Sequence, residues 1–428
     1  MQNGRGTFEN FRKSIQPEWI EQALKATGTA TIRRRRLPAE QVIWLVLGMA
    51  LFRNLAITEV VKRLDLALPG KTDPARASVA QARRRVGPAP LKWLFELCAR
   101  KWAHASARTL SWRGLSLYGV DGTTVRVPDS LANHRHFGRP NSGRGEGGYP
   151  MLRLVTLMAL RSHLLLAARF GPYGMGEQRL ADDLWPELPE HSLVLFDRGF
   201  WAARTLLAIS SGTARYWLTR ERKNLQRTVL RRLGPGDELV EFEVPAQIRE
   251  QDPALPEHFQ ARALVYQRPG YQPQMLLTSL LDPKVFPARE VVALYHERWE
   301  LELGFDEVKT ELLEREEAIR SQTPDAIEQE LWGIALAYNL IRQEMSHAAK
   351  LAGLPPSRLS FVAGLHFIRE ELVLCSLLDS VATIPKHLDR LRRNLSHMIL
   401  PPRRPLRSFP RAVKIKITNY PRKPVAHA

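Results

Sequence analysis

The chain has 428 residues, of which 44% are hydrophobic and 25% charged, as in a soluble globular protein of two or three domains. Its 63 Lys and Arg against 44 Asp and Glu give a net charge of +19, which favours a polyanionic partner such as nucleic acid. The longest apolar run, residues 42–52, is too short to span a bilayer, and the two cysteines lie in separate apolar patterns. We therefore expect a cytoplasmic protein without a disulfide framework or a zinc site.

Residues 1–108 are predicted to form an all-helical N-terminal domain, because Gly and Pro separate several helical patterns there. Two basic clusters lie in this region, at residues 33–36 and 83–85. The second ends a helix predicted over residues 76–86, with Ser78 as its cap. Such a helix enters a DNA groove in some proteins and is simply solvated in others, and the pattern leaves both open.

From Leu115 onward the hydrophobic pattern becomes that of strands. The first predicted strand ends at Asp121, and the fourth, a continuous apolar run buried on both faces, ends at Asp197. A glycine-rich polar loop is expected over residues 131–148. The five predicted strands lie within residues 114–127, 151–160, 163–174, 192–200 and 214–220, and helices are predicted over 176–185 and 201–210.

A single helix is predicted over residues 291–313, after two hairpins that form a β-rich insertion over residues 223–283. Four polar side chains at spacings of 3, 4 and 7 residues share one face of this helix, within an arc of roughly 60°. Apolar residues cover much of the remaining surface, so we expect the polar face to line a cleft; a solvated face is the alternative. The four residues are Tyr295, Arg298, Glu302 and Lys309.

The order of these elements is that of a ribonuclease-H-like core, in which strands one and four are neighbours and the last helix packs across them. Asp121, Asp197 and Glu302 would then meet at one point. Three carboxylates this close repel each other unless cations share them, and oxygen ligands select Mg²⁺ or Mn²⁺. Taken singly, each acid has a structural explanation: a turn after Asp121, an ion pair of Asp197 with Arg198, or a solvated Glu302.

The segment YHERWELELGFDEVK, residues 295–309, fits the pattern Y-x2-R-x3-E-x6-K. It resembles the signature of bacterial insertion-sequence transposases of the DDE class, in the insertion-sequence-four branch. YGVDGT and LFDRGFW resemble the two Asp motifs of that family, and LPAEQVIWLVLGMALFRN resembles its N-terminal domain. The resemblance implies that Asp121, Asp197 and Glu302 bind two catalytic Mg²⁺ ions, for which Mn²⁺ can substitute. It also implies that Tyr295, Arg298 and Lys309 contact phosphates of the transposon end.

The resemblance further implies a homodimer on double-stranded DNA that acts in the bacterial nucleoid on terminal inverted repeats and target DNA. Water would free a 3′-OH, which forms and then reopens a hairpin before it attacks the target. Trp217 is a candidate for holding a flipped base, although a core aromatic is the simpler interpretation. Two alternatives stay open: a nuclease on the same fold that does not join strands, and a catalytically silent DNA-binding regulator. A membrane-surface role rests on charge alone.

The predicted fold class is α/β, or α+β overall. It has a ribonuclease-H-like catalytic core, a β-rich insertion before the last core helix, an all-helical N-terminal domain and a helical C-terminal region. The expected divisions are residues 1–108 for the N-terminal DNA-binding domain, 109–222 with 284–313 for the core, 223–283 for the insertion, 314–400 for the helical region and 401–428 for a basic tail.

Overall fold

The structure of the chain is a computed structural model. It describes residues 15–30, 37–66, 74–142, 145–222, 225–267, 272–314, 319–376 and 384–401. The basic cluster at residues 33–36 and the predicted tail beyond Pro401 lie outside the described residues. Within the described part, no helix combines the length and the apolar character needed to cross a membrane.

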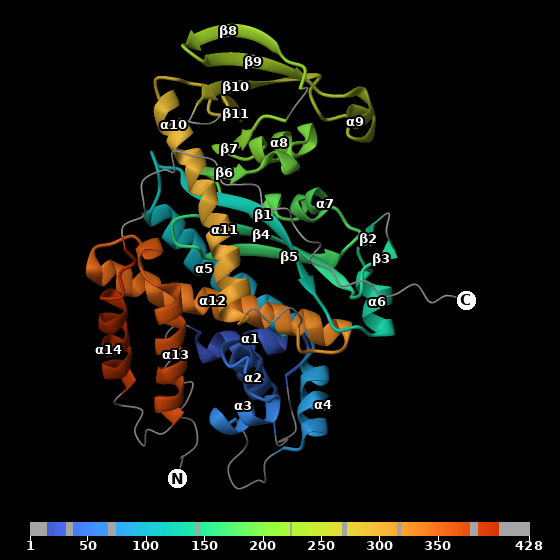
Figure 1. The fold of residues 1–428 in the computed structure, drawn as a ribbon, viewed down its shortest axis with the longest axis vertical. Helices are drawn as coiled ribbons and strands as arrows, with labels where there is room; N and C mark the ends of the chain where they lie inside the picture. Colours follow the sequence, from blue (N-terminus) through green and yellow to red (C-terminus); the bar gives the residue numbers. More distant parts are fainter. Residues whose placement is uncertain are drawn as a thin grey trace.

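Five helices form the N-terminal part of the chain (Figure 1). The apolar run of residues 42–52 becomes most of α2, which has no polar face and is buried almost throughout. Gly48 allows α2 to pack closely against the end of α3, because a Cβ at this position would lie 2.5 Å from Leu64 Cδ1. The bounds are α1 Pro17–Ala26, α2 Ala39–Leu51, α3 Ile57–Arg63, α4 Arg76–Val86 and α5 Ala89–Thr109.

A nine-stranded sheet in the order β5-β4-β1-β6-β7-β11-β10-β9-β8 forms the centre of the molecule (Figure 1). β1, β4 and β5 are antiparallel neighbours, whereas β6 runs parallel to β1 and β7 runs parallel to β6. This half of the sheet has the ribonuclease-H-like topology, which confirms the predicted fold class. Its strands are β1 Ser116–Arg126, β4 Met151–Ala159, β5 Leu165–Pro172, β6 Ser192–Phe196 and β7 Arg215–Arg220.

The segment expected to be a loop over residues 131–148 contains regular structure. The Ser130 hydroxyl accepts a hydrogen bond from the Asn133 N–H and so begins a short helix, a capping signal that the sequence analysis overlooked. Two further helices lie close to the predicted positions after β5 and β6. The elements are α6 Leu131–Phe137, β2 Asn141–Ser142, β3 Gly145–Glu146, α7 Glu177–Asp182 and α8 Ala203–Ser210.

The β-rich segment continues the central sheet, because β11 pairs with β7. A buried ion pair holds this extension: Arg262 Nη2 lies 2.6 Å from Asp237 Oδ2, and Arg262 Nη1 donates to the Phe286 carbonyl at 2.6 Å. Burying such a pair requires both charges to be matched, so the pair fixes the packing of these strands. The elements are β8 Thr228–Gly234, β9 Asp237–Glu243, α9 Ala246–Gln251, β10 His258–Tyr266 and β11 Gln274–Thr278.

The helix predicted over residues 291–313 is helical along this length but not regular. It consists of α10 Ala288–Tyr295, a 3₁₀ turn His296–Arg298, α11 Trp299–Asp306 and a π-helical turn Glu307–Leu312. The run crosses the sheet in front of β1, β4 and β5 (Figure 1). A π-helical turn holds an extra residue, so it changes the direction in which Lys309 points, and such turns are frequent at functional sites.

Three helices complete the described chain, and the longest, α12, lies between the N-terminal helices and the sheet (Figure 1). Arg83 of α4 is buried and donates from Nε to Gln329 Oε1 on α12 at 2.9 Å. The basic end of α4 is therefore only partly solvated: Arg84 and Arg85 are exposed, but Arg83 joins two helices. Ser78 lies inside α4 and does not cap it. The bounds are α12 Pro324–Ala352, α13 Phe361–Ser376 and α14 Ile384–Ser396.

Candidate active site

The register of two parallel strands places Asp121 beside Asp197. β1 pairs with β6 up to Val120 and Phe196, and each aspartate is the next residue of its strand. β6 ends there, whereas β1 continues along β4 to Arg126, so the first strand does not end at Asp121 as predicted. In the described part of the chain, no strand pairs with β1 beyond Val120 on the side of β6. The two aspartates thus stand at a gap in the sheet.

Each aspartate is fixed by a nearby glycine. Asp121 Oδ1 accepts from the Gly122 N–H at 2.8 Å, and Asp197 Oδ1 accepts from the Gly199 N–H at 2.7 Å. Burial, together with the charges of Asp197 and Glu177, raises the pKa of Asp121 to about 6, against the opposing effects of the Gly122 N–H and of Arg298. The Asp121 carboxylate is therefore costly to ionise in this fold, mainly because it is buried and to a lesser extent because other carboxylates are near.

Arg298 links the helix to the aspartates. Its Nη2 donates to Glu302 Oε1 at 2.9 Å, and its charge also acts on Asp121. Burial lowers the pKa of Arg298, but the charges and hydrogen bonds of its neighbours outweigh burial and raise it overall. The guanidinium is thus a fixed cation between the strand and the helix.

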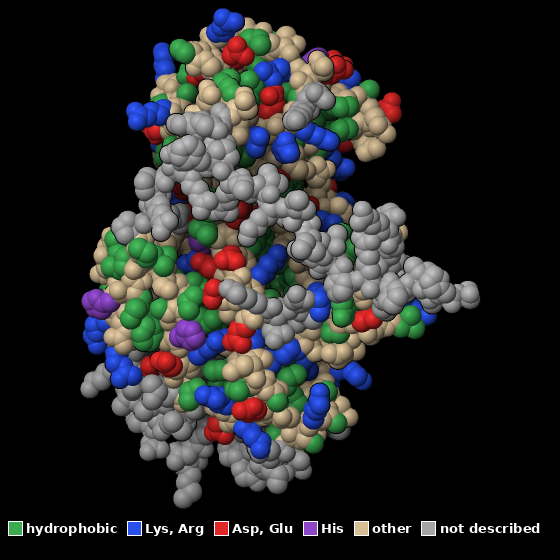
Figure 2. Space-filling model, viewed as in Figure 1, with side chains coloured by type: hydrophobic (Ala, Val, Ile, Leu, Met, Phe, Trp, Pro, Cys, Tyr) green, Lys and Arg blue, Asp and Glu red, His purple; other side chains and the backbone are tan. Residues whose placement is uncertain are grey.

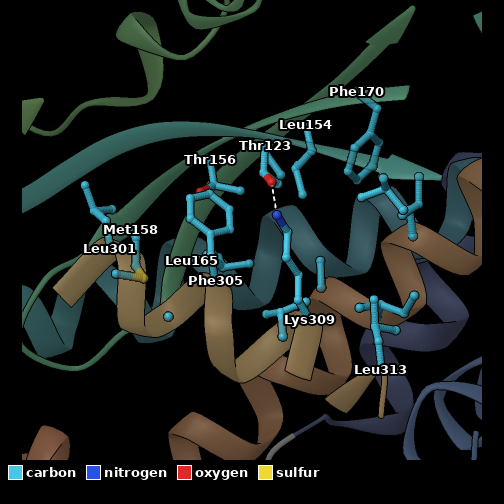
Figure 3. A pocket seen from close by; sticks show the side chains of 17 residues that line it. Thr123, Leu154, Thr156, Met158, Leu165, Phe170, Leu301, Phe305, Lys309 and Leu313 are labelled. Atoms are coloured by element: carbon cyan, nitrogen blue, oxygen red, sulfur yellow. Dashed lines mark hydrogen bonds between the residues drawn. The ribbon is translucent and has the colours of Figure 1, made fainter. Parts of the chain in front are cut away.

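Lys309 reaches from the π-helical turn to β1, where its ammonium bonds the hydroxyl of Thr123 (Figure 3). Burial lowers the pKa of Lys309, and the charge of Asp121 opposes this shift. The Lys309 side chain passes over an apolar pocket between the sheet and the helix, lined by Leu154, Phe305 and further residues of β4, β5 and α12 (Figure 3). The apolar surroundings leave its charge available to an anion at the mouth.

Tyr295 lies on the same side but is largely buried, and burial raises the pKa of its hydroxyl. The charges of Arg298 and Asp197 both act on Tyr295, so its ring lies near the aspartates. Trp217, in contrast, is buried in β7, and its indole N–H donates to Ser210 Oγ at 3.2 Å. Trp217 is a core residue in this structure and is not placed to hold a base.

The oxygen donors at the gap fit a hard divalent cation. Asp121 and Asp197 stand side by side, and a cation between them would relieve the repulsion that contributes to the raised pKa of Asp121. Glu302 is held by Arg298, and among the described residues no group of three His, Cys, Asp or Glu side chains is close enough to hold a metal ion. The expected three-carboxylate pocket would form only if Glu302 turned from the guanidinium.

The opposite face of the helical run carries a second group of charges. His163 Nε2 lies 2.8 Å from Glu300 Oε2, and Glu307 Oε2 accepts from the Tyr338 hydroxyl at 2.8 Å and from Arg342 Nε at 3.0 Å. Burial opposes ionisation of Glu307, but the Arg342 and His163 charges outweigh it and lower its pKa to about 2. These groups fix the helix against the β4–β5 turn and α12.

The sequence analysis missed two residues near the aspartates, Thr123 and Glu177. Thr123 stands in the DGTT segment that was interpreted only as a turn. Glu177 begins α7, in the segment predicted as a helix over residues 176–185, and no motif in that segment marked it as a site residue. On the face crossed by α11, acidic and basic side chains surround a hollow in the middle of the molecule (Figure 2).

The sequence of this chain matches a known protein family. Residues 5–96 match the family described as insertion element 4 transposase N-terminal, and residues 112–340 match the transposase DDE domain. The chain is 37% identical over 426 residues to the transposase InsG for insertion sequence element IS4 of Escherichia coli (strain K12), covering 98% of this chain and 95% of that protein. A solved piggyBac transposase synaptic complex with hairpin DNA aligns at 12% identity and a TM-score of 0.42, over 94% of this chain and 87% of that one, too weakly to carry an argument.

Proposed function

The chain belongs to the insertion-element-4 family of DDE transposases, and from that premise we propose that it cuts both ends of its own DNA element and joins the freed 3′-OH to target DNA. The observation that carries the proposal is that Asp121 and Asp197 each follow the last paired residues of β1 and β6, at the gap beside β1, while Arg298 bonds Glu302 and its charge acts on Asp121. An acidic site flanked by fixed cations suits phosphoryl transfer, because both metal ions and phosphate oxygens find partners there.

We assign the roles as follows. Asp121, Asp197 and Glu302 would hold two Mg²⁺ ions, or Mn²⁺ in their place, which would stabilise the charge on the entering and leaving oxygens. Arg298 and Lys309 bind phosphates of the element end. Arg298 is partly buried, so its charge would act on a phosphate more strongly than that of a fully solvated arginine, whereas Lys309 is exposed. Arg298 releases Glu302 as it takes a phosphate, which frees the third carboxylate for the cations.

Three further parts of the proposal follow from family membership. The second strand is cut through a hairpin, the protein acts as a homodimer so that each end meets one active site, and it works in the cytoplasm at the nucleoid. The net charge of +19 supports electrostatic binding along the phosphate backbone of DNA.

The test uses the full-length protein, labelled element ends and Mg²⁺; the ends are identified as inverted repeats that flank the coding region. The wild-type protein should nick the labelled ends and convert them to hairpins, which a denaturing gel detects. It should also join pre-cleaved ends to a plasmid. Glu302→Gln should lower cleavage roughly 1000-fold or more while end binding stays intact. Cleavage by Glu302→Gln at the wild-type rate would reject the site. Cleavage without joining by wild type would identify a nuclease, and end binding without cleavage would identify a regulator.

A further inference from the structure

The first turn of α7 approaches Asp121 from the face of the sheet opposite to the catalytic helix. Side chains alternate along β1, and Thr123 meets Lys309 on one face. Gly122 points to the other face, where a Cβ would lie 2.5 Å from Cδ of Glu177. Glu177 therefore packs directly on the strand beside Asp121, and only glycine at position 122 leaves room for it.

Glu177 is held by one of its two oxygens. Arg153 of β4 donates from Nη1 to Glu177 Oε1 at 2.6 Å, and its Nη2 donates to the Tyr173 carbonyl at 3.2 Å. Among the described residues none bonds Glu177 Oε2, and the side chain is 36% exposed. A carboxylate with one oxygen fixed by a guanidinium and the other open to solvent is a well-placed acceptor for water.

The same turn of α7 is tied to Asp197. Gln178 Nε2 donates to the Gly199 carbonyl at 2.6 Å, and the N–H of Gly199 holds Asp197. Glu177 and Gln178 thus lie next to the two glycines whose N–H groups hold Asp121 and Asp197. The charge of Glu177, like that of Asp197, contributes to the raised pKa of Asp121.

We propose that Glu177 is a fourth acidic residue of this active site and accepts the proton of the water that makes the first cut; the inference rests on the proposed function. The water oxygen bonds to phosphorus, the bond from phosphorus to O3′ breaks, and the water proton passes to the Glu177 carboxylate. O3′ leaves with a proton from solvent, which gives a 3′-OH on the element and a 5′-phosphate on the flank. Glu177 then returns its proton to solvent.

The difference between the two nucleophiles assigns Glu177 to hydrolysis rather than to joining. An attacking 3′-OH is positioned by the strand that carries it, whereas water must be held by hydrogen bonds to the protein. In an in-line displacement the entering and leaving oxygens lie on opposite sides of phosphorus. Glu177 lies over Gly122 on the α7 face of β1 and Glu302 lies on the α11 face, so a phosphate at the open edge beside β1 would have an acidic group on each side.

The experiment compares wild type, Glu177→Gln and Glu177→Asp as full-length proteins in Mg²⁺, with nicking of intact ends and joining of pre-cleaved ends measured separately. Glu177→Gln should slow nicking about 100-fold, the usual contribution of a general base, and leave joining at the wild-type rate. Glu177→Asp keeps the carboxylate and should recover part of the nicking. Glu187→Gln is the matched control, because Glu187 also pairs with an arginine at 34% exposure.

The outcomes separate cleanly. Loss of nicking with normal joining supports the assignment. Equal loss of both steps by Glu177→Gln and Glu177→Asp, or wild-type nicking by Glu177→Gln, overturns it. Binding of labelled ends and of Mn²⁺, followed by paramagnetic resonance, should be unchanged in Glu177→Gln; a large fall in Mn²⁺ affinity would make Glu177 a metal ligand instead and overturn the role in water activation. If wild type neither nicks nor joins, the proposed function itself fails.

Discussion

The two faces of the helical run from α10 to the π-helical turn carry similar residues in different environments. On the back face Glu307 is bonded by Tyr338 and Arg342. On the front face the Glu302 side chain is 40% exposed, and Arg298 Nη2 lies 2.9 Å from its Oε1. The charges on the back face are paired with each other inside the protein. Those on the front face are more exposed and can bind a phosphate or a cation.

This difference shows why a charged residue on a helix is weak evidence of function by itself. Glu302 and Glu307 are five positions apart in one run, and both lie near arginines. The back-face pair is buried and gains its stability only while both partners are present. The front-face pair is more exposed, so water screens it and the protein can break it at small cost.

The largest expected effect comes from substituting the same residue type on the two faces. Arg342→Met should lower the free energy of unfolding by about 3–5 kcal/mol, because it leaves the Glu307 charge buried without its partner. Arg298→Met should cost about 1 kcal/mol or less, since its pair is partly exposed. Chemical denaturation of both variants checks this. Equal losses would remove the distinction between the faces.

A smaller effect concerns Asp121, whose pKa is about 6 in the fold against an ordinary value of 3.8. The folded state holds the Asp121 proton more tightly, so this stabilising contribution is complete below pH 3.8 and is lost as the pH rises through 6. Asp121→Asn carries no charge and should be about 3 kcal/mol more stable than wild type at pH 7.5 in EDTA, with little difference at pH 4.

The control for Asp121→Asn is Mg²⁺. If a cation relieves the repulsion, adding Mg²⁺ at pH 7.5 should raise the Tm of wild type and leave that of Asp121→Asn nearly constant. A stability difference that is the same at both pH values would show that the charge of Asp121 costs nothing.

The smallest effect concerns Lys309, whose ammonium stands at the mouth of the apolar pocket. Lys309→Met should reduce the slope of log affinity for element ends against log salt by about 1, since one phosphate contact is lost. Lys350 is exposed in the last turn of α12, so Lys350→Met is the control and should keep the wild-type slope. Equal slopes for wild type and Lys309→Met would exclude the phosphate contact.

Much of the site could be predicted from local patterns. The apolar run that ends at Asp197 and the change of period before Asp121 both reflect strands buried in a sheet, so both aspartates could be assigned to strands, although β1 continues past Asp121 to Arg126. The irregular turns around Arg298 and Lys309 were not, because 3.6-residue periodicity cannot show where a helix tightens or widens.

The sequence by itself determined the family, the ribonuclease-H-like order of strands and helices, and the positions of the two aspartates, because hydrophobic periodicity and short motifs are properties of neighbouring residues. Only the tertiary structure decided that Glu302 is held by Arg298, that Arg83 is buried against α12, and that Glu177 stands beside Asp121. Such contacts depend on how the whole chain folds, and residue spacing along the sequence does not predict them. Folding decides which partner each charged side chain meets.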